Sequence, residues 1–213
     1  MARRPTPIIT GGPTGIDVDR RLAELGFGSR GLILAVRDVA HAREGEGASP
    51  FFPANGAGTL AYQYGTHELR ARLDELGWRL ENPLGTAASR HPTEARRALY
   101  QNVDVACSLA NDPHPRTRKG VGAERLAQSS LFPEEELISD FDEAPRDCEA
   151  WYVMVDEKGA VEVTNAVVRD GKFVEFRERL FVDDGSELSI VDEAHDDTDG
   201  EGAIEFDISI ARK

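Results

Sequence analysis

The residues best suited to chemistry form a basic segment that ends in two glycines. Its cations and glycines are Arg116, Arg118, Lys119, Gly120 and Gly122, and a helix is predicted directly after them. A helix N-terminus presents free backbone N–H groups and a partial positive charge, so it attracts anions. Arginine adds bidentate contacts to phosphate, and glycine lets the backbone come close to it. We therefore predict that this segment contacts phosphate or nucleic acid. The alternative is an ordinary solvated loop.

A second group of side chains is of the kind that works in acid–base catalysis. Asp104, His114 and Glu124 could together form a polar patch, and such groups move protons or bind metals. Asp104 and Cys107 fall on a helix predicted from residue 93 to about 109, where the thiol is expected to be buried and structural. A metal-dependent hydrolase or nuclease that uses Asp104, His114 and Glu124 is the alternative function.

Other segments resemble sites but lack essential residues. The glycine-rich turn at 11–15 lacks the ending of a P-loop, and Asp17 and Asp19 after it would repel phosphate. The acidic run at 192–202 begins like a calcium loop, but the position that needs a bidentate glutamate holds Ile208. The five histidines show no metal-ligand spacing. No cofactor and no metal site is predicted, and binding is preferred over catalysis.

Charge is distributed unevenly along the chain. Residues 1–130 carry about +3 and residues 131–213 about −17, which gives the net charge of −14. This excess predicts an acidic β surface that docks a basic partner protein. Alternatively, Glu205 and Asp207 only protect an edge strand from aggregation. The net charge argues against strong general affinity for nucleic acid, which is mainly electrostatic.

Size and composition are those of a globular protein. The 213 residues can bury a full core, and 40% of them are hydrophobic and 30% charged. No apolar run reaches the roughly 20 residues of a membrane span, no secretory signal follows the N-terminus, and only two cysteines are present. A cytoplasmic protein is expected, and its oligomeric state is not predicted.

The order of the predicted helices and strands indicates an α+β fold. An acidic linker (134–149) is expected to connect a mixed, largely helical part (1–133) to a mainly antiparallel β part (150–213). The two parts are expected to pack against each other as one unit. Strands are predicted from hydrophobic alternation and turn signals at residues 7–10, 31–39, 59–64, 78–80, 151–155, 161–168, 172–182 and 204–210. Helices are predicted from capping residues and i, i+4 spacing at 17–25, 66–76, 93–109 and 123–130.

Overall fold

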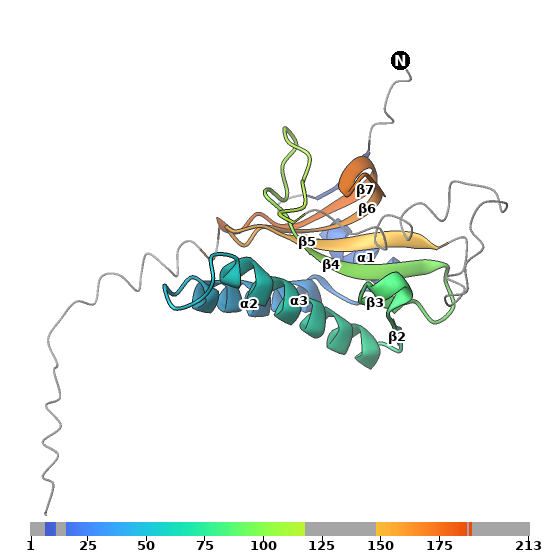
Figure 1. The fold of residues 1–213 in the computed structure, drawn as a ribbon. Coiled ribbons are helices and arrows are strands. Elements are labelled where there is room, and N and C mark those ends of the chain that lie inside the picture. Colours follow the sequence, from blue (N-terminus) through green and yellow to red (C-terminus); the bar gives the residue numbers. More distant parts are fainter. Residues whose placement is uncertain (1–6, 12–15, 118–147, 187, 189–213) are drawn as a thin grey trace, which may run out of the picture.

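A seven-stranded sheet with three α-helices forms the part of the chain that the structure describes (Figure 1). The computed structural model describes residues 7–11, 16–117, 148–186 and 188. The helices are α1 (Ile16–Glu24), α2 (Arg30–Gly47) and α3 (Gly56–Glu75), and a short 3₁₀ helix, η1, covers Pro83–Gly85. The strands are β1 (Ile8–Thr10), β2 (Arg79–Glu81), β3 (Ala88–Arg90), β4 (Arg96–Asn102), β5 (Glu149–Val155), β6 (Val161–Arg169) and β7 (Lys172–Asp183). The predicted α+β class is confirmed.

One continuous sheet joins the N-terminal and C-terminal parts of the sequence. Its strand order is β1-β7-β6-β5-β4-β3-β2, with parallel pairs β1–β7 and β4–β5 and antiparallel pairs elsewhere. The β4–β5 pairing runs from Arg96 opposite Glu149 to Asn102 opposite Val155. The two parts therefore share backbone hydrogen bonds. The predicted part boundaries stay a prediction, since most of the linker lies outside the described residues.

The C-terminal hairpin follows its sequence signal. Asp170 and Gly171 both have positive φ, at 52° and 73°, which is the conformation that a two-residue type I′ turn requires. β6 and β7 therefore pair directly around this turn. The strands predicted at 7–10, 78–80 and 151–155 and the helix at 17–25 are also confirmed. The predicted helix 123–130 and strand 204–210 lie outside the described residues.

The strand predicted at 31–39 is wrong, because this segment belongs to α2. Its alternating leucines suggested a strand. However, the buried residues of α2 include Ile33, Val36 and Ala40, and their spacing of three and four residues marks one helix face. The Ser29 side chain accepts a hydrogen bond from the Leu32 amide and so caps the helix.

The strand predicted at 59–64 is also wrong, because α3 begins already at Gly56. Ala61, Gly65, Leu69 and Leu73 are buried at four-residue intervals, so a single stripe continues through both predicted segments. Two of these four residues are small, which hid the helical pattern from a search for large apolar residues.

The helix predicted at 93–109 is wrong as well, since the segment forms β4 and the start of the loop 103–117. β4 lies inside the sheet, and every residue from Arg97 to Asn102 is buried. A strand that is covered on both faces shows no alternation of apolar and polar residues. The i, i+4 spacing of Leu99 and Val103 therefore led to the prediction of a helix.

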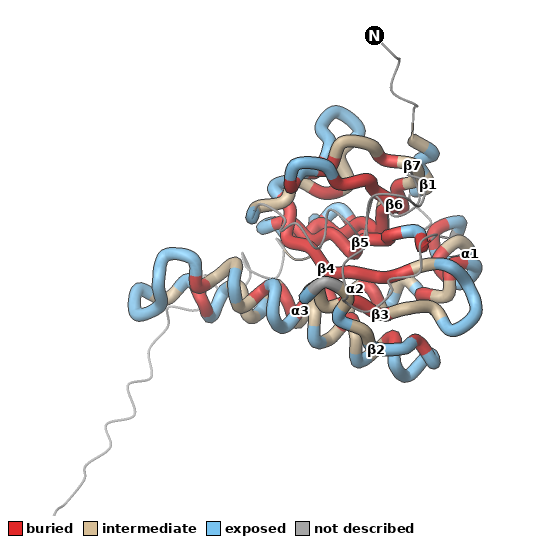
Figure 2. Tube along the Cα trace, turned by 45° about the vertical axis from the view of Figure 1, so that its right-hand side comes forward, coloured by how far each residue is buried: buried red, intermediate tan, exposed pale blue. Residues whose placement is uncertain are grey.

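The main core lies between the helices and the sheet. Phe27 and Trp78 stack with ring centroids 5.3 Å apart, and Trp151 from β5 meets Phe27 edge-on. Figure 2 shows burial concentrated in the central strands, while the end of the α2–α3 pair that projects beyond the sheet is exposed. Phe51 at this end is 96% exposed. Among the described helices, none is both long and apolar enough to cross a membrane.

The loop 103–117 is tied to the opposite face of the sheet. The Asp156 carboxylate accepts from the Ala106 amide at 3.0 Å, and Glu162 accepts from the Cys107 amide at 2.7 Å. Glu162 also receives a bidentate pair of hydrogen bonds from Arg179, at 3.0 and 2.8 Å. Both side chains of this ion pair are buried, so loop and sheet share one polar network.

Candidate functional site

The predicted basic segment enters the structure only through Arg116. Its guanidinium contacts the carboxylates of Glu44 on α2 and Glu157 after β5, the latter at 2.8 Å. These two carboxylates balance the charge of Arg116, so little of it remains for a ligand. The other predicted contacts, Arg118, Lys119, Gly120 and Gly122, lie outside the described residues, and their role stays a prediction.

The predicted acid–base group is assembled in part. Asp104 accepts from the His114 amide at 2.8 Å, and its second oxygen lies 3.3 Å from His114 Nδ1. Asp104 stands on the loop 103–117 rather than on a helix, and both side chains are more than half exposed. Glu124 lies outside the described residues. Asp104 and His114, two members of the predicted polar patch, are therefore in contact, although the element predicted for Asp104 is wrong.

Cys107 is partly buried rather than fully buried as predicted, and it lies on a loop with φ of 52°. Its thiol donates to the carbonyls of Val161 and Asp183 at 3.1 and 3.2 Å. Burial raises the pKa of the thiol, and the charge of Glu162 raises it further. A protonated, enclosed thiol is a poor nucleophile, so this residue fastens the loop to the sheet.

Three arginines stand side by side on neighbouring strands. Arg79 on β2 is directly opposite Arg90 on β3, and Arg90 is directly opposite Arg97 on β4. Directly opposed residues share a sheet face and lie about 5 Å apart at Cβ, where like charges destabilise the sheet. We call Arg79, Arg90 and Arg97 the arginine row. It lies on the face that carries Ala88, Leu99 and Tyr152, opposite the helices.

The arginine row leads from solvent into the protein. Arg79 is exposed and Arg90 is half-buried, whereas Arg97 is only 1% exposed. Arg97 Nε donates to Glu81 Oε1. Arg97 Nη1 and Nη2 are buried and have no hydrogen-bond partner in the described part of the chain. Because these two atoms carry four N–H donors, the guanidinium has an unused donor edge.

The charges of Arg97 and Arg90 act on the neighbouring Cys148 thiol. Burial raises the pKa of the nearby Cys148 thiol, and the charges of Arg97 and Arg90 counteract that rise. Glu81 is the carboxylate that contacts the arginine row. A buried guanidinium with open donors is costly unless something satisfies it. The geometry fits an oxyanion, whose oxygens would accept from both Nη atoms.

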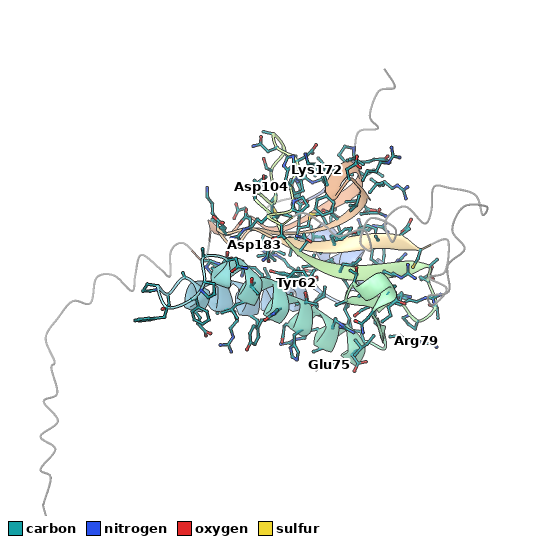
Figure 3. All side chains as sticks on the ribbon, in the orientation of Figure 1. Tyr62, Glu75, Arg79, Asp104, Lys172 and Asp183 are labelled. Carbon is teal, nitrogen blue, oxygen red and sulfur yellow. The ribbon has the colours of Figure 1, made fainter. Side chains whose placement is uncertain are left out.

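Sequence reasoning missed the arginine row. Its residues are 11 and 7 positions apart in the chain and belong to three different strands, two of which have only three residues. Figure 3 shows Arg79 at the β2 edge, away from Asp104 in the loop. Pro92 is a turn signal between β3 and β4, but register alone brings the arginines together.

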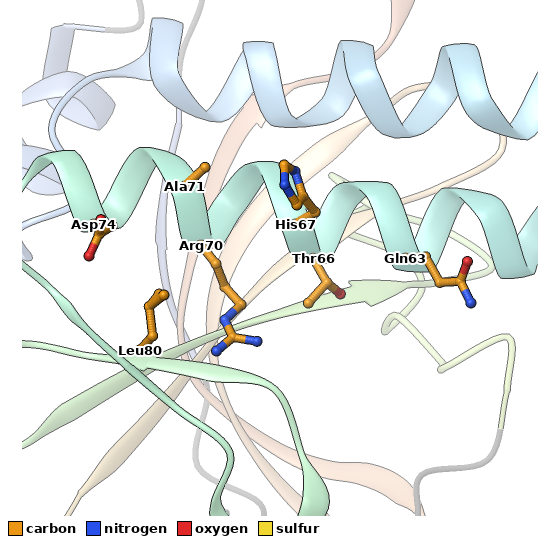
Figure 4. Close-up of a pocket in the computed structure, with 7 residues that line it drawn as sticks. All are labelled: Gln63, Thr66, His67, Arg70, Ala71, Asp74 and Leu80. Atoms are coloured by element: carbon orange, nitrogen blue, oxygen red, sulfur yellow. The ribbon is translucent and has the colours of Figure 1, made fainter.

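A groove between α3 and β2 lies on the helix-covered face (Figure 4). It encloses about 400 Å³. Thr66 and Arg70 point from α3 toward the strands, and Leu80 lies beneath them. Thr66 Oγ1 and Arg70 Nε are buried and lack a partner within the described segments. The lining of the groove includes both Arg70 and Asp74, so it offers an anion less net positive charge than the arginine row does.

Known proteins give no further guidance. Comparison of the chain with known protein families, with curated proteins and with solved structures finds no match. Within the described residues, no group of three or more His, Cys, Asp or Glu side chains could hold a metal ion.

Proposed function

We propose that this chain is a binding protein for a ligand that carries an oxyanion, and that the arginine row is its binding site. The observation that supports this is the donor edge of Arg97, which is buried and unpartnered. In the arginine row, like charges are directly opposed on neighbouring strands, and a buried guanidinium has donors without partners. Natural proteins tend to break such rules of sheet pairing and hydrogen bonding at functional sites. The proposal keeps the phosphate-binding function predicted from sequence but adds a different site for it.

Affinity for inorganic phosphate, measured by titration calorimetry, tests the proposal. Arg97→Gln and Arg90→Gln should each weaken binding about tenfold or more, since each removes a charge-assisted contact of about 1.5–3 kcal/mol. Arg20→Gln is the matched control, because Arg20 is exposed on α1 and pairs only with Asp17 in the described structure. If the row variants bind like the control, the arginine row is not the site.

Two sequence predictions stand beside this proposal. The basic partner protein was inferred from acidic segments at 134–149 and 183–213, most of which lie outside the described residues. Arg118 and Lys119 are tested by an Arg118→Ala/Lys119→Ala variant in the same titration. We also propose that the protein is cytoplasmic. Both of its cysteines are free.

A hydrolase remains the second candidate, because Asp104 and His114 do meet. A carboxylate on Nδ1 orients an imidazole and leaves Nε2 to move a proton. Cleavage of DNA, RNA or nucleotides with added Mg²⁺ or Mn²⁺ should then fall at least tenfold in Asp104→Asn and in His114→Gln. Absence of cleavage by the wild type would remove this candidate.

A further inference from the structure

The charge around the arginine row can be compared with that of a ligand. The three arginines carry three positive charges at every accessible pH, and the carboxylate of Glu81 contributes one negative charge. Glu149 lies on the other face of the sheet, where it is directly opposite Arg96 and accepts from Trp151. In the described part of the chain, two positive charges of the arginine row therefore remain uncompensated.

We propose that the arginine row binds a phosphomonoester in its dianionic form; this inference rests on the proposed function above. A phosphomonoester carries a charge of about −1.5 to −2 at pH 7 and presents three acceptor oxygens. Two of these oxygens match the open Nη1 and Nη2 edge of Arg97, and the third is available to Arg90. A carboxylate or a phosphodiester carries a single negative charge, so it would leave one of the two uncompensated positive charges unbalanced.

The course of the arginine row favours a terminal group. Arg79 is exposed at the β2 edge of the sheet, whereas Arg97 is enclosed. A phosphate at the end of a ligand can enter from this edge and stop at Arg97. A phosphodiester inside a polymer has chain on both sides, whereas the arginine row is exposed at Arg79 and ends at the buried Arg97.

A ligand series at pH 8 tests the inference. We expect methyl phosphate to bind at least tenfold more tightly than dimethyl phosphate or acetate, and Arg97→Gln to remove this preference. Lowering the pH from 8 to 5 protonates the dianion, whose second pKa is about 6, and should weaken methyl phosphate binding about tenfold while acetate binding changes much less. Phosphoserine and a 5′-phosphorylated dinucleotide then show which kind of molecule supplies the group.

The outcomes separate the two proposals. Equal affinity for methyl phosphate and dimethyl phosphate overturns the dianion inference but leaves oxyanion binding standing. Absence of binding by every oxyanion overturns both. Circular dichroism checks that Arg97→Gln is folded. If it is not, Arg90→Gln replaces it, because the half-buried Arg90 can be changed with less disturbance of the interior, and loss of the preference in that variant counts in the same way.

Discussion

At the scale of single residues, Glu162 holds the sheet and the loop 103–117 together. Its two oxygens accept from Arg179, from the Thr164 hydroxyl at 2.7 Å and from the Cys107 amide. Glu162 has no exposed surface. Its negative charge is therefore stable in the interior only because every neighbour is a donor.

Removing that charge should be costly. Glu162→Gln leaves the buried Arg179 with only the half-exposed carboxylate of Asp112, 3.7 Å from Nη1, as a counter-charge. Loss of one partner of a buried pair typically costs about 3–5 kcal/mol. We expect such a fall in the free energy of unfolding by urea titration. Glu157→Gln is the control, since Glu157 is largely exposed in its pair with Arg116 and should cost about 1 kcal/mol or less. Equal losses in both variants would contradict the role given to Glu162.

His91 makes stability depend on pH. Its Nδ1 accepts from the Glu94 amide at 3.0 Å, and its ring meets Trp78 edge-on. Burial and the charge of Arg96 lower the pKa of His91 below the usual 6.5. The unfolded chain therefore binds more protons than the folded one just below pH 6.5, and the sign of the linkage makes stability fall as the pH falls.

Unfolding measured between pH 7.5 and pH 5 checks this effect. The His91→Gln variant should lose the part of the pH dependence that His91 contributes, whereas His67→Gln, which changes an exposed histidine of α3, should keep the wild-type slope. An unchanged slope in His91→Gln would show that other groups cause the acid sensitivity.

At the scale of elements, close packing of α3 on β4 depends on one glycine. A Cβ built on Gly65 would lie 2.4 Å from the Tyr100 ring, which is buried. The helix can approach the sheet here only because Gly65 has no side chain.

Gly65→Ala should therefore lower the free energy of unfolding by about 1–3 kcal/mol through overpacking. Gly45→Ala in α2 is the matched control, because nothing lies within 4 Å of its added Cβ and alanine favours a helix by about 0.5–1 kcal/mol. Denaturant titration of the two variants should give shifts of opposite sign. If the Gly65→Ala variant is as stable as the wild type, α3 can move away from β4 without cost, and the close packing does not depend on this glycine.

The elements also show where sequence patterns are sufficient. Strands β5 to β7 were predictable because their apolar runs and the Asp170-Gly171 turn act locally. The predictions for segments 31–39, 59–64 and 93–109 are wrong, because the hydrophobic repeat there does not match the element that forms. Apolar residues alternate in α2, small residues stand at buried positions of α3, and β4 is buried on both faces. The arginine row depends on the register of two three-residue strands, and register is set by tertiary pairing.

At the scale of the whole molecule, part of the uneven charge distribution joins the two parts of the sequence. Arg21 pairs with Glu178 at 2.7 Å, and Arg30 and Arg37 both bind Asp183. In each of these three pairs the cation comes from the N-terminal part and the carboxylate from the C-terminal part. Arg97 departs from this pattern, because its carboxylate partner, Glu81, also belongs to the N-terminal part. Its Nη1 and Nη2 are buried and have no partner among the described residues.

Unfolding of the wild type and of Arg97→Gln in phosphate, and in chloride of equal ionic strength, tests the central claim most directly. A ligand that binds only the folded state stabilises it by about 2.7 kcal/mol at a hundred times its Kd. We predict that Arg97→Gln is no less stable than the wild type in chloride, since it removes two buried Nη groups that lack partners while the glutamine amide can still donate to Glu81. Only the wild type should gain stability in phosphate. A variant that loses the same stability in both salts would contradict the claim, because Arg97 would then serve the fold alone.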